Sequence, residues 1–191
     1  RAIVIRSIDE SSEGLIAAAK SVYGMPETGF NERKTSSFVK KQLEQLNLSV
    51  QTGIAITGLK AVIEGSNPGP TIAVIAELDA LRVPSHPGSD SDSGAAHACG
   101  HHIQIGALLG VATALVNPDV KHSLSGKVVF ILTPAEEFID IEDRLARRHN
   151  SEIEFLSGKQ EMIRLGVFDG IDMAMMIHAA NDDGKEYFSI G

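Results

Sequence analysis

The sequence predicts an α/β protein, a three-layer sandwich with a largely parallel central sheet and helices on both faces. Three apolar runs, at 71–79, 127–134 and 172–178, are typical of strands buried on both faces, and the first of them is rich in β-branched residues. Helical patterns over 101–116 and 157–166 alternate with these runs. No internal repeat is visible, and this alternation is typical of helices packed on both sides of a parallel sheet.

Two helices are predicted near the start of the chain. Apolar residues at helical spacing indicate a first helix over residues 3–23, which Gly24 and Pro26 end. Asn31 is predicted to cap a second helix that continues to about Leu46, with its apolar residues on one side.

Strands and loops fill the next part of the chain. Residues 48–54 and 58–65 are predicted to form two strands, and the Pro- and Gly-rich stretch 66–70 is predicted to be a turn. Residues 86–96 form a polar loop that leads into the helix beginning near residue 101.

Composition limits the classes of protein that the chain can belong to. With 191 residues, 43% of them hydrophobic, the chain is long enough for one domain with a sizeable core. A net charge of −8 predicts neither a nucleic-acid partner nor a membrane-surface partner. The longest apolar run, 105–116, is shorter than the ~20 residues of a spanning helix. A single cysteine cannot form an intrachain disulfide, so we expect a reducing compartment, the cytoplasm.

Side chains that can bind a metal follow the buried strands or lie on the loop beside them. In open α/β sheets, binding sites form at the carboxyl ends of the strands, so these side chains are expected to meet in one crevice. They are Asp79 after the first buried strand, Glu136 and Glu137 after the second, His178 after the third, and Cys99 and His101 on the loop before a helix.

The residue types in this set favour metal-assisted hydrolysis. Thiolate, imidazole and carboxylate are the usual zinc ligands, and the last two also suit manganese, cobalt or nickel. Cys99 and His101 are two residues apart, so one short loop can direct both at one centre. Glu136 and Glu137 are adjacent and point different ways on an extended backbone, so one can bind metal while the other takes a proton from water.

Each feature also has a purely structural interpretation. Cys99 can be a buried core residue, the Glu136–Glu137 pair a solvated surface, His178 a core histidine and Asp79 a turn cap. Together, at the ends of neighbouring strands, they favour a metal site. A thiol-dependent hydrolase that uses Cys99 is a weaker interpretation, because nearby histidines compete as co-ligands and no second cysteine is present for redox chemistry.

Five segments together resemble the amidohydrolase branch of the co-catalytic, two-metal metallopeptidases. This branch includes hippurate hydrolases, auxin-conjugate hydrolases, N-acyl-diaminopimelate deacetylases and aminobenzoyl-glutamate hydrolases. The match runs in order along nearly the whole chain, and the pair HACGH and PAEE at this separation is far more specific than either motif alone. The segments are ETGFNERKTS, GPTIAVIAELDAL, HACGHH, GKVVFILTPAEE and KQEMIRLGVFDGIDMAMMIH.

The resemblance implies an enzyme that uses two divalent metal ions to cleave the amide bond of N-acyl or N-aroyl amino acids. Zinc or manganese is the expected metal, and cobalt or nickel also suits the ligands. By resemblance, Cys99, His101, Glu137 and His178 match metal ligands, Glu136 matches the general base, and Asp79 matches an acidic position near the metals that can orient a ligating histidine.

The chain departs from the family pattern beside the site. Many relatives have Asp where His102 stands, His where Gln104 stands and Pro where Arg82 stands, which puts substrate preference in doubt. The segment 137–158 is long and charged and is similar to an insertion found in one subgroup. The resemblance assigns no role to His97.

The chain is also about half as long as the family pattern. We therefore interpret residues 1–191 as the N-terminal part of a catalytic metallohydrolase domain, ending near where relatives carry an inserted dimerisation domain. The remainder would supply one more histidine ligand, and the whole protein is expected to be a homodimer. The alternative is a non-catalytic or inactive metal-binding module, because this piece alone lacks that ligand.

Overall fold

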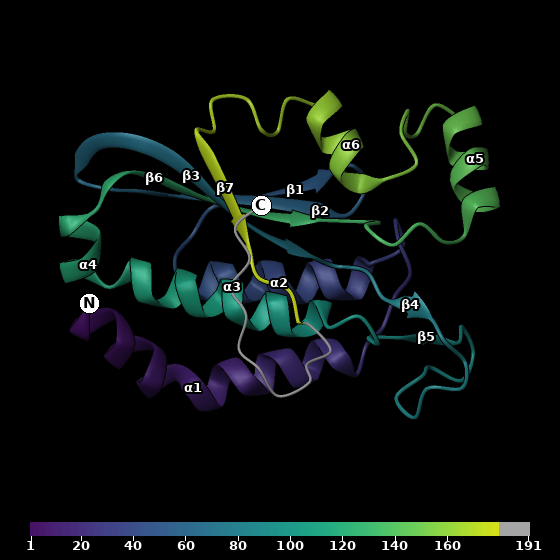
Figure 1. Ribbon diagram of the computed structural model, residues 1–191, viewed down its shortest axis with the longest axis horizontal. Helices are drawn as coiled ribbons and strands as arrows, with labels where there is room; N and C mark the ends of the chain where they lie inside the picture. Colours follow the sequence, from purple (N-terminus) through teal and green to yellow (C-terminus); the bar gives the residue numbers. More distant parts are fainter. Residues whose placement is uncertain (180–191) are drawn as a thin grey trace.

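A computed structural model gives the fold of the protein and describes residues 1–179. Its centre is a five-stranded sheet in the order β1-β2-β6-β3-β7 (Figure 1). β6, β3 and β7 pair in parallel, whereas β2 is antiparallel to both β1 and β6, so β2 alone runs against the other four strands. The strands are β1 Val50–Ile54, β2 Gly58–Glu64, β3 Asn67–Glu77, β6 Ser125–Thr133 and β7 Met173–Met176, and a separate hairpin pairs β4 Leu81–Arg82 with β5 Ala95–Ala96.

Helices lie on both sides of the sheet, and the predicted three-layer α/β fold is confirmed. Figure 1 shows one layer of helices below the strands and a second layer above them. The lower layer contains α1 Ala2–Tyr23, α2 Arg33–Gln45, α3 His101–Val116 and α4 Pro118–Ser123, and the upper layer contains α5 Ile141–His149 and α6 Gly158–Arg164. Among the described residues, no helix is both long enough and apolar enough to cross a membrane.

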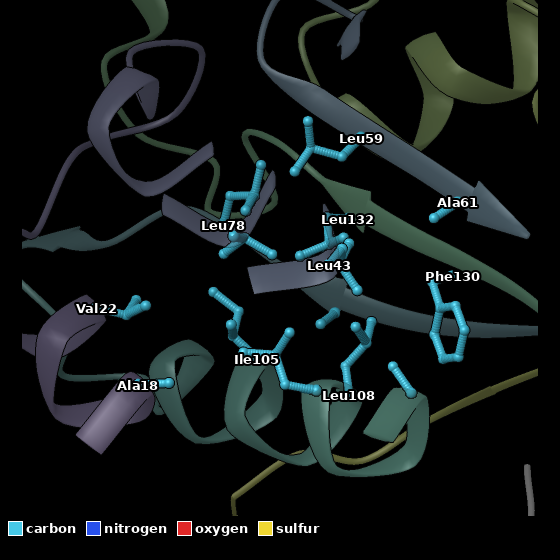
Figure 2. Close-up of a cluster of buried hydrophobic side chains, with 14 of the residues drawn as sticks. Ala18, Val22, Leu43, Leu59, Ala61, Leu78, Ile105, Leu108, Phe130 and Leu132 are labelled. Atoms are coloured by element: carbon cyan, nitrogen blue, oxygen red, sulfur yellow. The ribbon is translucent and has the colours of Figure 1, made fainter. Parts of the chain in front are cut away.

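The main core lies between the sheet and helices α1, α2 and α3 (Figure 2). Val22, Leu43, Ile105 and Leu108 project from the three helices toward the sheet, where Phe130 is fully buried. At roughly 25 cal/mol per Å² of apolar surface removed from water, side chains of this size supply most of the stability of the layer. This core attaches α3 firmly to the sheet, and α3 begins at a candidate site residue.

The strand register brings the predicted site residues to one edge of the sheet. In the parallel pair β3 and β6, Glu77 lies opposite Thr133, and the Leu78 amide still donates to the Thr133 carbonyl at 2.9 Å. On the other side of β3, Ile75 lies opposite Met176. All three strands therefore end side by side, as the prediction requires.

The predicted cap of the second helix is wrong. The residue at the N-cap of α2 is Glu32, and Asn31 does not cap the helix with its side chain. The carboxylate of Glu27 instead accepts the amides of Lys34 at 3.1 Å and Thr35 at 2.9 Å. A cap supplied from upstream through a folded loop leaves no signal at the helix start itself.

Two strand predictions also need correction. Residues 66–70 do not form a simple turn, because β3 already begins at Asn67, which pairs with Ser125 before an irregularity that ends at Thr71. β7 is not buried, since all of its residues are exposed in the described structure. Its apolar composition is that of an interior strand, but among the described strands it is an edge that pairs only with β3.

Candidate metal centre

His101 lies at the centre of the candidate site. The side chain is fully buried at the first position of α3, and Gly100 before it has a φ of 99°, a left-handed conformation that favours glycine. The ring Nδ1 lies 2.8 Å from the Asp79 carbonyl oxygen, which can only accept, so Nδ1 carries the proton and donates. Nε2 therefore faces the remaining groups of the site.

Three carboxylates lie around His101 Nε2. The nearest oxygen of Glu77 is 3.0 Å away, and the nearest oxygens of Glu136 and Glu137 are each 3.9 Å away. Ligand atoms of His101, Glu77 and Glu136 all lie within 4.8 Å of one another. The turn after β6 thus brings both adjacent glutamates to the same imidazole.

Glu77 is a site residue that the sequence reasoning missed. It is 1% exposed and lies two residues before Asp79, so a strand period of two directs both side chains to the same side. Gln104 accepts the Glu77 amide at 2.9 Å and donates to its carboxylate at 3.1 Å. The alternation of strand side chains was the available signal, but the prediction followed only the last residue of the apolar run.

Cys99 and His178 complete a second group with His101. The Cys99 Sγ and the His178 Nε2 are 3.3 Å apart, and ligand atoms of the three residues lie within 4.8 Å of one another. His178 is exposed and follows β7, whereas Cys99 precedes α3. Residues far apart in the chain therefore meet as the sequence predicts.

Asp79 lies behind His101 rather than in front of it. Its side chain is fully buried, with one oxygen 3.6 Å from His101 Nδ1 and the other accepting the Glu137 amide at 2.9 Å. Burial raises the pKa of Asp79 to about 6, although His101 and the backbone amides of Glu137 and Glu136 act to lower it. This position suits a residue that orients His101 and the Glu137 backbone.

Lys159 of α6 is a second residue that the sequence reasoning missed. Its ammonium forms an ion pair with Glu77 and lies 3.7 Å from the nearest Glu136 oxygen. Burial acts to raise the pKa of Glu77, but the adjacent His101 and Lys159 outweigh it and hold the pKa at about 2. A lysine on a charged helix looks like a surface residue, so no sequence pattern distinguishes it.

The donor set fits a divalent cation. Two buried atoms that face the site, His101 Nε2 and Glu137 Oε1, have no hydrogen-bond partner among the described residues. Buried polar atoms of this kind are costly unless a proton donor, water or metal satisfies them. The carboxylates around His101 also leave an excess of negative charge that Lys159 only partly offsets.

The surroundings of Cys99 disfavour a free nucleophilic thiolate. Burial, a hydrogen bond to Glu137 and repulsion from Glu136 and Glu77 raise the pKa of the thiol to about 12. A thiol with such a high pKa is a poor nucleophile, whereas a bound cation stabilises the thiolate. The structure therefore weakens the thiol-hydrolase interpretation of Cys99.

The other residues that depart from the family pattern lie around this cluster. His102 packs against the Tyr23 ring, with ring centroids 5.1 Å apart, and against the buried His97 at 5.6 Å. Arg82 forms a two-point ion pair with Asp140, with N–O distances of 3.2 and 3.0 Å. Among these departures, Gln104 is the one that hydrogen-bonds a site carboxylate within the described part of the chain, that of Glu77.

A family model and several curated relatives match the chain. The model described as "Peptidase family M20/M25/M40" matches residues 73–190. Thermostable carboxypeptidase 1 of Saccharolobus solfataricus is 32% identical over 91% of this chain and 41% of its own length. An N-acyl-L-amino acid amidohydrolase of Geobacillus stearothermophilus is 28% identical over 91% of this chain and 43% of its own length. The chain thus spans about two fifths of these relatives.

A solved structure agrees in fold. The Bacillus subtilis YXEP protein, described as a dinuclear metal binding peptidase from the M20 family, superposes with a TM-score of 0.67 at 26% identity. The match covers 91% of this chain and 42% of that protein.

Proposed function

The chain belongs to peptidase family M20/M25/M40, and we propose that the whole protein is a two-metal amidohydrolase that cleaves N-acyl or N-aroyl amino acids. One observation carries the proposal. The side chains of Glu136, Glu137 and Glu77 surround the free Nε2 of His101, and Cys99 and His178 lie against each other beside it. Ionisable groups gathered in this way at the ends of three strands are typical of functional sites.

Four residues would hold the metal ions. They are Cys99, His101, Glu137 and His178, and the mixture of thiol, imidazole and carboxylate suits zinc or manganese and also accepts cobalt or nickel. Divalent cations bound there would lower the pKa of a water molecule and polarise the carbonyl of the scissile amide. Asp79 orients His101 through its carbonyl and holds the Glu137 backbone through its carboxylate.

Glu136 would serve as the general base and then as the general acid. Its side chain is about one third exposed, so it can reach a water molecule and a substrate. As the water oxygen bonds to the amide carbon, Glu136 takes the water proton. When the carbon–nitrogen bond breaks, Glu136 passes that proton to the amine, and the products are a carboxylic acid and a free amino acid.

The substrate class rests on the relatives and on the resemblance. An N-acyl-L-amino acid amidohydrolase and a carboxypeptidase both match this chain, and both names imply cleavage of an amide bond next to an amino acid. The resemblance further supports a homodimer, and the single cysteine supports a cytoplasmic location. A non-catalytic metal-binding module is the second candidate, because the described residues supply only part of the expected ligand set.

Replacing Glu136 tests this function in the whole protein. Glu136→Gln is expected to keep its bound metal, measured by elemental analysis, and to lose at least ~10³-fold in kcat on a hippurate-type substrate. Glu142→Gln, an exposed glutamate on α5, is the matched control and should keep the wild-type rate. Near-normal turnover by Glu136→Gln would remove Glu136 as the base. Stoichiometric metal without turnover by the wild type would favour the non-catalytic module.

A further inference from the structure

The turn that presents both glutamates has an unusual backbone. We call residues 134–137 the Ala135 turn, because Ala135 has a φ of 49° although it is not glycine. Left-handed backbone is disfavoured for residues with a Cβ and persists only where the surrounding structure enforces it. Ala135 is fully buried and directly precedes Glu136, so whatever enforces this conformation also aims the two carboxylates.

Glu32 binds the amide side of the turn. One carboxylate oxygen accepts the Ala135 amide at 2.8 Å, and the other accepts the Thr57 hydroxyl at 2.5 Å. Glu32 is fully buried, and among the described residues its carboxylate makes no other side-chain hydrogen bond. A buried carboxylate is costly unless it is hydrogen-bonded, and here one of its partners is the strained residue itself.

Arg144 binds the carbonyl side of the turn. Its guanidinium donates to the Glu137 carbonyl at 2.5 Å, to the Leu156 carbonyl at 2.8 Å and, at 3.4 Å, to the Ala135 carbonyl. One face of the guanidinium lies over the Phe30 ring, 5.5 Å from the ring centroid. The guanidinium therefore holds carbonyls on both sides of Glu136.

Arg144 has no ion-pair partner within 4.0 Å among the described residues, although it is fully buried. Burying a charge this way contributes little to stability compared with an apolar residue of similar volume. What the planar guanidinium provides is several hydrogen bonds with fixed directions, a geometry that no apolar side chain supplies.

Close packing leaves the turn little room to relax. A Cβ added at Gly29 would lie 2.7 Å from Ala135 Cβ, and a Cβ at Gly158 would overlap the Pro134 carbonyl oxygen. The Gly158 amide also donates to the Ala135 carbonyl at 3.1 Å. The backbone on either side of the turn can approach this closely because both positions are glycine.

We propose that Arg144 and Glu32 are positioning residues that hold the Ala135 turn in the conformation from which Glu136 and Glu137 reach the candidate metal centre. Helix α5, which lies in the charged segment 137–158, is then a working part of the site rather than a surface insertion. The consequence for catalysis rests on the proposed role of Glu136 as general base, whereas the consequence for the turn itself does not.

Substitutions of Arg144 in the whole protein test the proposal. Arg144→Lys keeps the charge but loses the fork of donors, and Arg144→Met also loses the charge. Arg148→Met, an exposed arginine on the same helix, is the matched control. Glu32→Ala removes the acceptor of the Ala135 amide, and Glu32→Gln, which retains an acceptor oxygen, is the conservative rescue.

Two readouts separate positioning from general stability. Hydrogen exchange of the peptide that spans residues 134–137 should accelerate at least ~10-fold in Arg144→Lys and Glu32→Ala, with the amides of β6 unchanged and Arg148→Met like wild type. At saturating metal, kcat should fall ~100-fold with KM within ~3-fold, the effect of a small misplacement of a catalytic group. Glu32→Gln should restore most of the slow exchange in the turn and most of the wild-type kcat.

Unchanged exchange in the turn, or exchange that rises equally in the turn and in β6, would overturn the proposal. If Arg144→Met fails to fold, Arg144→Lys and the Glu32 pair still decide the question. Exchange needs no activity, so a protein that hydrolyses nothing would sink the proposed function and leave the positioning result readable. Faster exchange in the turn with wild-type kcat would overturn the link to Glu136.

Discussion

Two regions of the molecule are held together by different physical effects. The core between the sheet and helices α1, α2 and α3 consists of apolar side chains from many elements, which Figure 2 shows pointing into the space between the strands and the helices. The Ala135 turn and the groups around His101 are instead held by buried polar atoms, among them Glu32 and Arg144, that bind backbone groups.

The difference explains why one region supplies stability and the other supplies chemistry. Burial of apolar surface is non-directional, so the core tolerates changes of shape and mainly sets the free energy of unfolding. Hydrogen bonds are directional, so the polar region fixes where a few carboxylate oxygens lie. Changes in the core should therefore alter stability with little change in the geometry of the site, whereas changes in the polar region should alter that geometry as well as stability.

The largest effect is expected in the core. Phe130→Ala removes a fully buried ring from the centre of the sheet and should lower the free energy of unfolding by ~3–5 kcal/mol. Urea unfolding of the whole protein measures this loss, and Val62→Ala on neighbouring β2, where the side chain is 38% exposed, is the control. A large change in metal content of the folded Phe130→Ala protein would break the comparison.

The next effect concerns the buried carboxylate of Glu32. Burial and repulsion from Asp79 raise its pKa from the ordinary 4.5 to about 7. The folded protein then binds the carboxyl proton of Glu32 more tightly than the unfolded chain does. As the pH rises from 4.5 to about 7, Glu32 therefore lowers the free energy of unfolding progressively. Above pH 7 this decrease in unfolding free energy, which the non-titrating Glu32→Gln variant lacks, should approach ~3 kcal/mol.

Urea unfolding of the metal-free whole protein at pH 5 and pH 8 measures this effect. The gap in unfolding free energy between the wild type and Glu32→Gln should shift with pH in favour of the variant at pH 8. Parallel pH profiles of the two proteins would show that Glu32 does not titrate in this window.

A smaller effect is expected from the hydrogen bonds that hold Glu77. Gln104→Leu leaves the buried Glu77 amide without its acceptor and removes a donor to the Glu77 carboxylate. The cost should be ~1–3 kcal/mol of unfolding free energy. Gln45→Leu, at an exposed position of α2, is the control and should change stability by less than ~0.5 kcal/mol. Equal losses of unfolding free energy in Gln104→Leu and Gln45→Leu would show that the hydrogen bonds between Gln104 and Glu77 do not stabilise the fold.

The smallest effect concerns the reactivity of Cys99. Burial acts most strongly to raise the pKa of its thiol, followed by the hydrogen bond and charge of Glu137. In the metal-free whole protein, Glu137→Gln should therefore lower that pKa and accelerate alkylation by iodoacetamide up to ~10-fold, the effect of one pKa unit. Glu136→Gln should accelerate it less. Mass spectrometry over time follows the reaction. An unchanged alkylation rate in Glu137→Gln would show that Glu137 does not raise the pKa of the Cys99 thiol.

Much of the fold could be predicted because its signals are local. The helix over residues 101–116 and the strand that ends near Thr133 follow from apolar periodicity within a single segment. Helices α4 and α5 were not predicted, since α4 is short and α5 carries many charges. The prediction that β7 is buried was wrong, because composition does not say whether a strand lies at the edge of a sheet.

Some residues of the site could likewise be predicted from local sequence signals, and others could not. Cys99, His101, Glu136 and Glu137 could be named because each follows a recognisable strand or helix boundary in a specific motif. Glu77 could have been found from strand alternation. Lys159 and Arg144 could not, because their sequence neighbourhoods are those of ordinary surface helices.

The sequence by itself determined the α/β class, the family and the side chains that converge at the ends of the strands. Only the tertiary structure decided how those side chains are held, through contacts such as that of Glu32 with the Ala135 amide, 103 residues away along the chain. The physical reason is that hydrophobic periodicity depends on residues close together in the sequence. The partner of a buried charge depends instead on which backbone groups the tertiary fold brings next to it.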